Sequence, residues 1–291
     1  MEEELTIRPA RPEDKAAVLA FCEQTWEWGD YIADVWDEWL ADQAGRLMVA
    51  LLEGRPVGVV HMQMVSPHEC WLEGMRVDPA ERRRGISRRL NAEAMNEARK
   101  LGATVARLAI HADNAPSHQA AAQGGFEQIG TFLHYEAPAE VLAGEEKPAP
   151  APGEDLPALM ALLARSTIYP AMGGLLYSGW SGRMLTEEVM REHLTAHAVL
   201  SLRQWDDFQA IAICGFQDTD DSLLMVEYLD GSNEGIGRLA YGLRALAAEK
   251  GLERVLVTIP DLLMLRDVLE GTGYQAIDSG VFLVYQRQLA G

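Results

Sequence analysis

Cysteine is scarce in this 291-residue chain, which has only Cys22, Cys70 and Cys214, scattered and odd in number. Three dispersed cysteines do not make the disulfide framework of a small secreted domain, so we expect reduced thiols. No Cys or His spacing matches a zinc site, and we expect no metal cofactor. The chain has no apolar run of membrane-spanning length, and its acidic start lacks the apolar core of a signal peptide. We therefore expect a cytoplasmic protein without a membrane partner.

Basic residues are also in short supply. The 25 lysines and arginines face 44 aspartates and glutamates, for a formal net charge of −19. Nucleic-acid binding needs a basic face, so we expect no nucleic-acid partner. An acidic surface can steer cationic amines toward a site, or it can simply keep the protein soluble, and the sequence leaves both alternatives open. With 48% hydrophobic residues, the chain is long enough to bury the cores of two domains.

Three consecutive arginines, Arg82–Arg84, nevertheless stand together in one loop. Residues 70–77 before the loop are predicted to form a strand, which ends because Pro79 cannot donate a ladder hydrogen bond. Residues 86–101 after it repeat apolar positions at helical spacing, and Gly102 suits a helix C-terminus. A basic, glycine-containing loop between a strand and a helix directs backbone N–H groups at one point. The sequence therefore predicts a pyrophosphate-binding loop.

The residues that follow the loop indicate which kind of phosphate-binding loop it is. After a second predicted strand come Asn114, Ser117 and Gly125-Phe126. With Arg82-x-x-Gly85-x-Ser87 before them, this order resembles the Gcn5-related N-acetyltransferase (GNAT) superfamily, whose loop pattern is Gln/Arg-x-x-Gly-x-Gly/Ala. The serine departs from the last position of that pattern but is still small. The resemblance covers residues 5–136, and the alternative is a basic helix start that binds no ligand.

The resemblance implies a fold, a reaction and a set of cofactor contacts. The fold is a mixed α/β one, with a central sheet flanked by helices. The reaction is transfer of an acetyl group from acetyl-CoA to the primary amine of a small molecule or peptide, by direct attack in a ternary complex. The residues that the family pattern places at the cofactor are Met75, Arg76, Val77, Arg82, Arg83, Arg84, Gly85, Ile86, Ser87, Asn114 and Ser117.

Glu73 is the candidate catalytic base. Strand alternation places Trp71, Glu73, Met75 and Val77 on one face. Many GNAT relatives carry a glutamate at this position of the strand, where it deprotonates the amine through water. Partial burial beside Trp71 and Met75 would make the carboxylate a better base. The alternative is a solvent-facing carboxylate, or one paired with an arginine.

The proton donor to the CoA thiolate is harder to assign. The family's usual tyrosine position is occupied by Ala121, which has no proton to donate. Water can serve instead, because a CoA thiolate is a tolerable leaving group. His118, on the same predicted short helix, is a candidate replacement, with a surface histidine as the alternative; His111 and His134 are weaker candidates.

Aromatic and acidic residues cluster near the first predicted helices, where GNAT relatives often wall the acceptor pocket. Trp28, Tyr31 and Trp36 are the candidate acceptor-binding residues, with Asp30 close by. Aromatic faces and carboxylates suit a cationic or aromatic amine. Core packing of amphipathic helices is the equal alternative.

The second half of the chain repeats the plan of the first. A Pro- and Ala-rich segment at residues 143–155 is predicted to link a domain at 1–142 to a second domain at 156–291. The second half again shows a strand, a loop at residues 232–237, a helix and a Gly-Tyr pair. Its loop has Ser, Asn and Glu in place of the arginines, and a carboxylate repels pyrophosphate. We expect a degenerate copy, although any two α/β units can look alike.

Two other functions stay open at this point. One is a non-catalytic acyl-CoA binder or sensor, which the absence of a tyrosine at position 121 would allow. The other is a tandem enzyme similar to mycothiol synthase, a family that keeps its active copy in the second half. A homodimer is compatible with the sequence, which does not define the oligomeric state.

Overall fold

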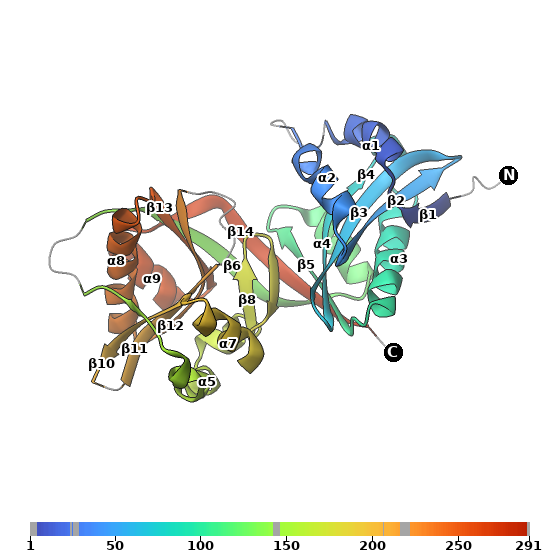
Figure 1. The fold of residues 1–291 in the computed structure, drawn as a ribbon. Helices are drawn as coiled ribbons and strands as arrows, with labels where there is room; N and C mark the ends of the chain where they lie inside the picture. Colours follow the sequence, from blue (N-terminus) through green and yellow to red (C-terminus); the bar gives the residue numbers. More distant parts are fainter. Residues whose placement is uncertain are drawn as a thin grey trace. The chain divides into compact units, whose positions relative to one another are not determined.

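The computed structural model describes residues 5–23, 25, 29–141, 146–205, 207–215 and 222–289 (Figure 1). The chain divides into two compact units. The first domain holds Met1–Ile110, Asn114–Gln128 and Tyr285–Gly291, and the second holds His111–Asp113 and Ile129–Val284. Among the helices described, none combines the length and the apolar character that a membrane crossing requires.

The first domain is a mixed sheet with helices on both faces, as expected from the sequence. Its strands lie in the order β1-β2-β3-β4-β5, and the end of β14 follows β5. Neighbours are antiparallel as far as β4, whereas β4 and β5 are parallel. The elements are β1 (Leu5–Pro9), α1 (Lys15–Cys22), α2 (Ile32–Ala41), β2 (Gly45–Leu52), β3 (Arg55–Ser66), β4 (Glu69–Val77), α3 (Ile86–Lys100), β5 (Val105–His111) and α4 (Ala115–Gln123), with short 3-10 turns at Pro12–Asp14 and Pro79–Glu81.

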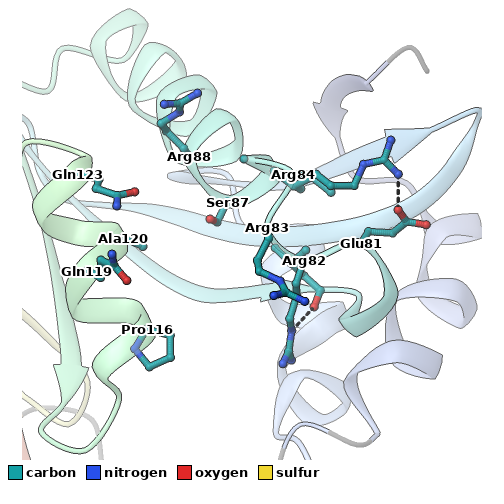
Figure 2. A pocket seen from close by; sticks show the side chains of 13 residues that line it. Glu81, Arg82, Arg83, Arg84, Ser87, Arg88, Pro116, Gln119, Ala120 and Gln123 are labelled. Carbon is teal, nitrogen blue, oxygen red and sulfur yellow. Dashed lines mark hydrogen bonds and ion pairs between the residues drawn. The ribbon is translucent and has the colours of Figure 1, made fainter. Parts of the chain in front are cut away.

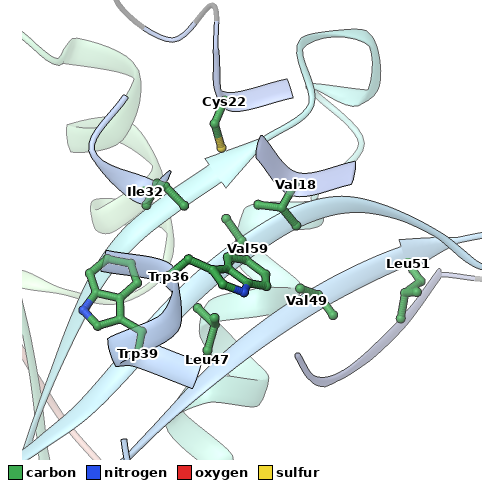
Figure 3. Close-up of a cluster of buried hydrophobic side chains, with 9 residues drawn as sticks. All are labelled: Val18, Cys22, Ile32, Trp36, Trp39, Leu47, Val49, Leu51 and Val59. Atoms are coloured by element: carbon green, nitrogen blue, oxygen red, sulfur yellow. The ribbon is translucent and has the colours of Figure 1, made fainter. Parts of the chain in front are cut away.

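Alternate residues of β3 bury opposite faces of this sheet. Val59 belongs to a core between α1, α2 and the sheet, whose members are Val18, Cys22, Ile32, Trp36, Trp39, Leu47, Val49, Leu51 and Val59 (Figure 3). A Cβ on the preceding residue, Gly58, would instead meet Leu90 and Ile86 of α3 at about 3 Å. Because successive strand residues point to opposite faces, α3 covers the face opposite α1 and α2.

Strand β4 departs from regular geometry in two places that matter for the site. It pairs with β5 only from Glu69 to Trp71, so the rest of β4 has no ladder partner on that side. Gly74 has a φ of +64°, and a Cβ there would come within 2.5 Å of the Trp39 ring. A residue in the left-handed region interrupts the pleat. The simple alternation expected for residues 71–77 is therefore broken at Gly74.

The second domain repeats the strand order of the first. Its sheet runs β14-β6-β13-β12-β11-β10-β7, with β12 and β13 parallel and β8 paired with β9 apart from it. The elements are β6 (Glu127–Pro138), β7 (Ala149–Pro150), α5 (Leu156–Arg165), α6 (Ile168–Ala171), β8 (Leu175–Ser178), β9 (Ser181–Met184), α7 (Glu187–Thr195), β10 (Val199–Gln204), β11 (Asp207–Cys214), β12 (Leu223–Gly231), α8 (Asn233–Glu249), β13 (Arg254–Pro260), α9 (Leu263–Gly271) and β14 (Gln275–Gln288), with a 3-10 turn at Gly153–Asp155.

The domain boundary differs from the one expected at residue 142. The division falls at Gln128, near the start of β6, and the last residues of the chain return to the first domain. The expected linker, residues 143–155, begins outside the described residues, but its later part belongs to the second domain. Ala149 and Pro150 pair with β10, and Pro148 packs against Gly242 of α8. A composition rich in proline and alanine carries no signal of such contacts.

The end of β14 is held inside the first domain by specific bonds. Arg107, which is 2% exposed, donates to Gln286 at 2.8 Å and to Glu69 at 2.5 Å. Arg287 donates to the Gly124 carbonyl at 2.6 Å. The Leu289 N–H donates to the carbonyl oxygen of Thr104 at 2.8 Å. The first domain is therefore completed by residues from the far end of the sequence.

A chain that stops at Val284 should have a destabilised first domain. It would lose the bonds made by Gln286, Arg287 and Leu289 and would uncover the edge of β5. At about 1 kcal/mol for each hydrogen bond, the free energy of unfolding should fall by roughly 3 kcal/mol, measured by urea denaturation. Gln288→Ala, at an exposed position of the same strand, is the matched control. Equal stability of the truncated and full chains would contradict this role.

Candidate active site

A cavity of about 610 Å³ opens in the first domain between the arginine loop and α4. Its walls come from two stretches of chain, shown in Figure 2. One is the end of β4, the loop and the start of α3, which contribute Val77, Glu81, Arg82, Arg83, Arg84, Gly85, Ile86, Ser87 and Arg88. The other is one face of α4, which contributes Pro116, Gln119, Ala120 and Gln123.

The start of α3 has no side-chain cap. Gly85 is its N-cap residue, with a φ of +75° and no side chain to accept from the helix N–H groups. Arg83 also lies in the left-handed region, with a φ of +65°. Backbone in this conformation turns N–H groups toward a common point, and the helix dipole adds positive potential there. The loop therefore offers backbone donors and positive charge to an anion.

The three arginines of the loop are not equivalent. Arg84 donates to Glu81 at 2.6 Å and extends away from α4 in Figure 2. Arg82 has one long contact, 3.5 Å, with the Val77 carbonyl. Arg83 forms no ion pair with any residue that the structure describes. Arg83 is thus the arginine of the loop most available to an anionic ligand.

The acidic residues beside the loop are already neutralised. Arg55 binds Asp78 at 2.7 Å and Glu81 at 2.8 Å. Burial alone would raise the pKa of Asp78, but hydrogen bonds from Arg55 and from the Ala80 N–H lower it below its usual value. Carboxylates paired in this way do not cancel the positive potential of Arg82 and Arg83.

Glu73 lies on β4, opposite His61 of β3. Its carboxylate is 2.9 Å from His61 Nδ1, and its side chain is 20% exposed. It stands on the part of β4 that is not paired with β5. Burial raises the pKa of the nearby Tyr31 phenol, Arg76 opposes this, and the Glu73 carboxylate raises the pKa further. Glu73 is thus partly buried and partly open, as a base for a bound amine needs to be.

The Arg76 side chain is engaged away from the cavity. Its guanidinium forms a two-point ion pair with Asp30, at 2.7 and 3.2 Å, and the Asp30 side chain is only 2% exposed. Arg76 Cζ also lies 5.3 Å from the centre of the Tyr31 ring. Its side chain does not line the cavity. It ties the segment before α2 to β4, so only its backbone is left for a cofactor.

The structure brings together some of the residues expected at the cofactor and separates others. Val77 and the six loop residues from Arg82 to Ser87 line the cavity, whereas Met75, Asn114 and Ser117 do not. The Asn114 side chain caps α4 by accepting from the Ser117 N–H at 3.2 Å. The described contact of Asn114 and Ser117 is therefore the N-terminal cap of α4.

The expected acceptor residues differ in whether the structure leaves them accessible. Trp36 is fully buried in the core of Figure 3, so for this residue the packing alternative holds. Tyr31 is 38% exposed and packs edge-on against Trp39. Trp28 lies outside the described residues. Tyr31 is therefore the one of the three whose described position leaves it open to a ligand.

The candidate proton donors do not gather at the cavity. His118 Nδ1 is 2.9 Å from the Tyr285 hydroxyl, and His118 is absent from the cavity wall. Burial raises the pKa of Tyr285. His111 and His134 fall in the second domain, where burial lowers the pKa of His134 to about 4. Ala121 is buried.

Sequence reasoning missed the α4 wall and His61. Pro116, Gln119, Ala120 and Gln123 follow the i, i+3, i+4, i+7 pattern of one helix face, a signal that was available but is polar and easily taken for solvent exposure. His61 carried no local signal, because its pairing with Glu73 depends on strand register. The structure describes no cluster of three or more His, Cys, Asp or Glu residues suited to a metal ion.

The corresponding region of the second domain is built differently. Strand β12 ends at Gly231, and Ser232 at once caps α8 by accepting from the Gly235 N–H at 3.0 Å. A Cβ on Gly235 would meet the Gln209 carbonyl at 2.2 Å. The helix start is thus capped and covered. Glu227, four residues before the strand end as Glu73 is in β4, is buried at 5% exposure.

Comparison with known proteins finds a family model that matches part of the chain. Residues 14–126 match the sequence model of the acetyltransferase (GNAT) family. No curated protein sequence matches the chain. Among solved structures, a GCN5-related N-acetyltransferase from Sphaerobacter thermophilus is 13% identical, with a TM-score of 0.62 over 98% of this chain and 95% of that one.

Two further solved structures align along the whole chain. A tandem GNAT protein from the clavulanic acid biosynthesis pathway is 16% identical, with a TM-score of 0.53 over 99% of both chains. A GCN5-related glucosamine N-acetyltransferase region of a fungal multi-domain GH3 β-N-acetylglucosaminidase is also 16% identical, with a TM-score of 0.64. That alignment covers 99% of this chain, which spans only 38% of the fungal one.

The match, the strand order and the loop agree with one another. Residues 14–126 match the GNAT family model, and the chain carries the GNAT fold in both of its domains.

Proposed function

We propose that the first domain transfers an acetyl group from acetyl-CoA to the primary amine of a small molecule or peptide, by direct attack in a ternary complex. The observation that carries the proposal is the cavity at the uncapped start of α3, lined by Arg82 and Arg83. It lies at the end of the strand that bears Glu73. The proposed binding site for the cofactor's pyrophosphate and the candidate base Glu73 are therefore both positioned by β4.

The loop would hold the pyrophosphate of acetyl-CoA. Free N–H groups at the start of α3 and the Arg83 guanidinium are suitable donors for its oxygens. The pantetheine arm would follow β4 along the stretch from Leu72 to Val77, for which no pairing with β5 is described. A backbone N–H there can also polarise the thioester carbonyl.

Glu73 would take the proton from the attacking amine, directly or through water. Removal of that proton leaves the nitrogen lone pair free to attack the thioester carbon, and the C–S bond then breaks. With Ala121 at the family's tyrosine position and His118 paired with Tyr285, water is the proton donor to the leaving thiolate that best fits the contacts.

The acceptor side is formed around Tyr31, whose exposed ring lies near Glu73 and Arg76. The net charge of −19 favours the approach of a cationic amine. Amino sugars belong in the acceptor panel because one structural neighbour contains a glucosamine N-acetyltransferase region. Amino acids, polyamines, aminoglycosides and peptides complete it.

We also propose that the second domain does not bind CoA and has a structural role. Its counterpart helix, α8, is capped by Ser232, which accepts from the Gly235 N–H, and it is covered there by Gln209, so fewer donors are left for a pyrophosphate than at α3. Glu234 in the first turn of α8 adds a negative charge where the first domain has arginines.

A second candidate function is an acyl-CoA sensor that does not turn over. The observation in its favour is the buried Ala121 in place of a tyrosine. A turnover screen with the acceptor panel, which follows thiol release from acetyl-CoA, separates the two. Thiol release above the hydrolysis rate with any amine rejects the sensor.

Arg83→Glu should weaken acetyl-CoA binding about tenfold to a hundredfold. This is the range for one lost charge-assisted hydrogen bond of about 1.5–3 kcal/mol. Calorimetry should show one site per chain. Glu234→Arg, at the matching place in the second domain, is the control and should leave the affinity unchanged. Two equal sites, or an affinity that Arg83→Glu leaves intact, would contradict the proposed loop.

Glu73→Gln should lower kcat about 10²- to 10⁴-fold, the usual contribution of a general base. Calorimetric affinity for acetyl-CoA should stay the same, because the carboxylate does not line the cavity. Glu227→Gln is the matched control, since it changes the corresponding strand residue of the second domain. Full activity of Glu73→Gln with an identified amine would remove Glu73 as the base.

A further inference from the structure

A buried imidazole lies between two carboxylates behind the proposed active site. His61 Nδ1 is 2.9 Å from Glu73 Oε1, and His61 Nε2 is 3.3 Å from Asp42 Oδ2. The His61 side chain is 1% exposed, whereas the side chains of Asp42 and Glu73 are 19% and 20% exposed. The ring is therefore hidden, and its two nitrogens face two partly exposed carboxylate side chains, although the Asp42 Oδ2 atom beside the ring is itself buried.

The ring of His61 is held in one orientation. Trp39 stacks on it with ring centres 4.6 Å apart and an angle of 12° between planes. Gly45 leaves room for the ring edge, since a Cβ there would lie 2.9 Å from His61 Nε2 and 2.1 Å from Asp42 Oδ2. These contacts prevent the imidazole from turning its nitrogens elsewhere.

Asp42 is itself oriented, at the residue that ends α2. Its Oδ1 accepts from the Ala44 N–H at 2.8 Å, which leaves Oδ2 directed at the ring. His61 Nδ1 is hydrogen-bonded to Glu73, whereas Nε2 and Asp42 Oδ2 lie within ion-pair distance without making a hydrogen bond. An ionised carboxylate only accepts hydrogen bonds, so the proton shared with Glu73 belongs on Nδ1. The chain Asp42–His61–Glu73 thus begins at a helix end and finishes at the proposed base.

We propose that His61 is a positioning residue for Glu73: stacked on Trp39 and within ion-pair distance of Asp42, it donates from Nδ1 and fixes the carboxylate in the direction of the acceptor amine. The inference rests on the proposed role of Glu73 as general base. It explains why a polar ring occupies a fully buried position on a strand whose neighbours are apolar. A buried histidine that only filled space would leave Nδ1 desolvated without the hydrogen bond that Glu73 provides.

The test is a double-mutant cycle between His61 and Glu73. His61→Leu should lower kcat about 10- to 100-fold, the usual result of a misplaced catalytic group, with the KM for acetyl-CoA unchanged. In the Glu73→Gln background the same substitution should have no further effect on kcat, because its target is gone. A loss of the same size in both backgrounds would show a structural role and overturn the proposal.

Conservative variants sharpen the result. His61→Asn keeps an N–H donor near the Nδ1 position and should recover part of the kcat lost in His61→Leu. Asp42→Asn should lower kcat less than His61→Leu, again only when Glu73 is present. Asp37→Asn, on the same helix but paired with Lys15, is the matched control and should have no effect. If His61→Leu does not fold, the Asp42→Asn cycle gives the same decision.

The outcomes separate this inference from the proposed function. Full activity of Glu73→Gln overturns both. A strong loss in Glu73→Gln together with unchanged kcat in His61→Leu and Asp42→Asn overturns the positioning role alone.

Discussion

The separation of β4 from β5 after three paired residues is the constraint on which the first domain depends. Backbone N–H and C=O groups need partners, and beyond Trp71 one side of β4 has none from the sheet. The proposed base and the proposed cofactor loop lie on that stretch or just after it, together with the interruption at Gly74. The strand that would normally be closed on both sides is left open where a ligand can supply the missing contacts.

The duplication makes the meaning of this arrangement clearer. Both domains have a parallel strand pair, a following helix and a glutamate four residues before the strand end. They differ in how the helix begins: α3 starts at a glycine without a side-chain cap, whereas α8 starts at Ser232, which caps it. A helix end that satisfies its own donors gains stability and loses the ability to bind an anion. The first domain thus keeps a helix start that can bind an anion, whereas the second domain has the more stable, capped helix start.

Features encoded by neighbouring residues could be predicted from the sequence. The end of β4, the loop and α3 were predicted correctly, because Pro79, Gly85 and the apolar spacing of the helix act locally. Contacts made over long separations could not be. Asp30 meets Arg76 across 46 residues, and Arg107 meets Gln286 across 179. Trp36 illustrates a different limit, because a tryptophan in a core and one in a pocket wall look alike in a sequence.

The return of the last strand to the first domain also has a consequence for synthesis on the ribosome. The edge of β5 leaves the ribosome long before Tyr285–Leu289 exist to cover it. At translation rates of about 5–20 residues per second, that edge stays unpaired for on the order of ten seconds. An unpaired strand edge is a template for association with other chains. Production of this protein should therefore depend on what shields the nascent chain during that interval, and the first domain matures last although it is made first.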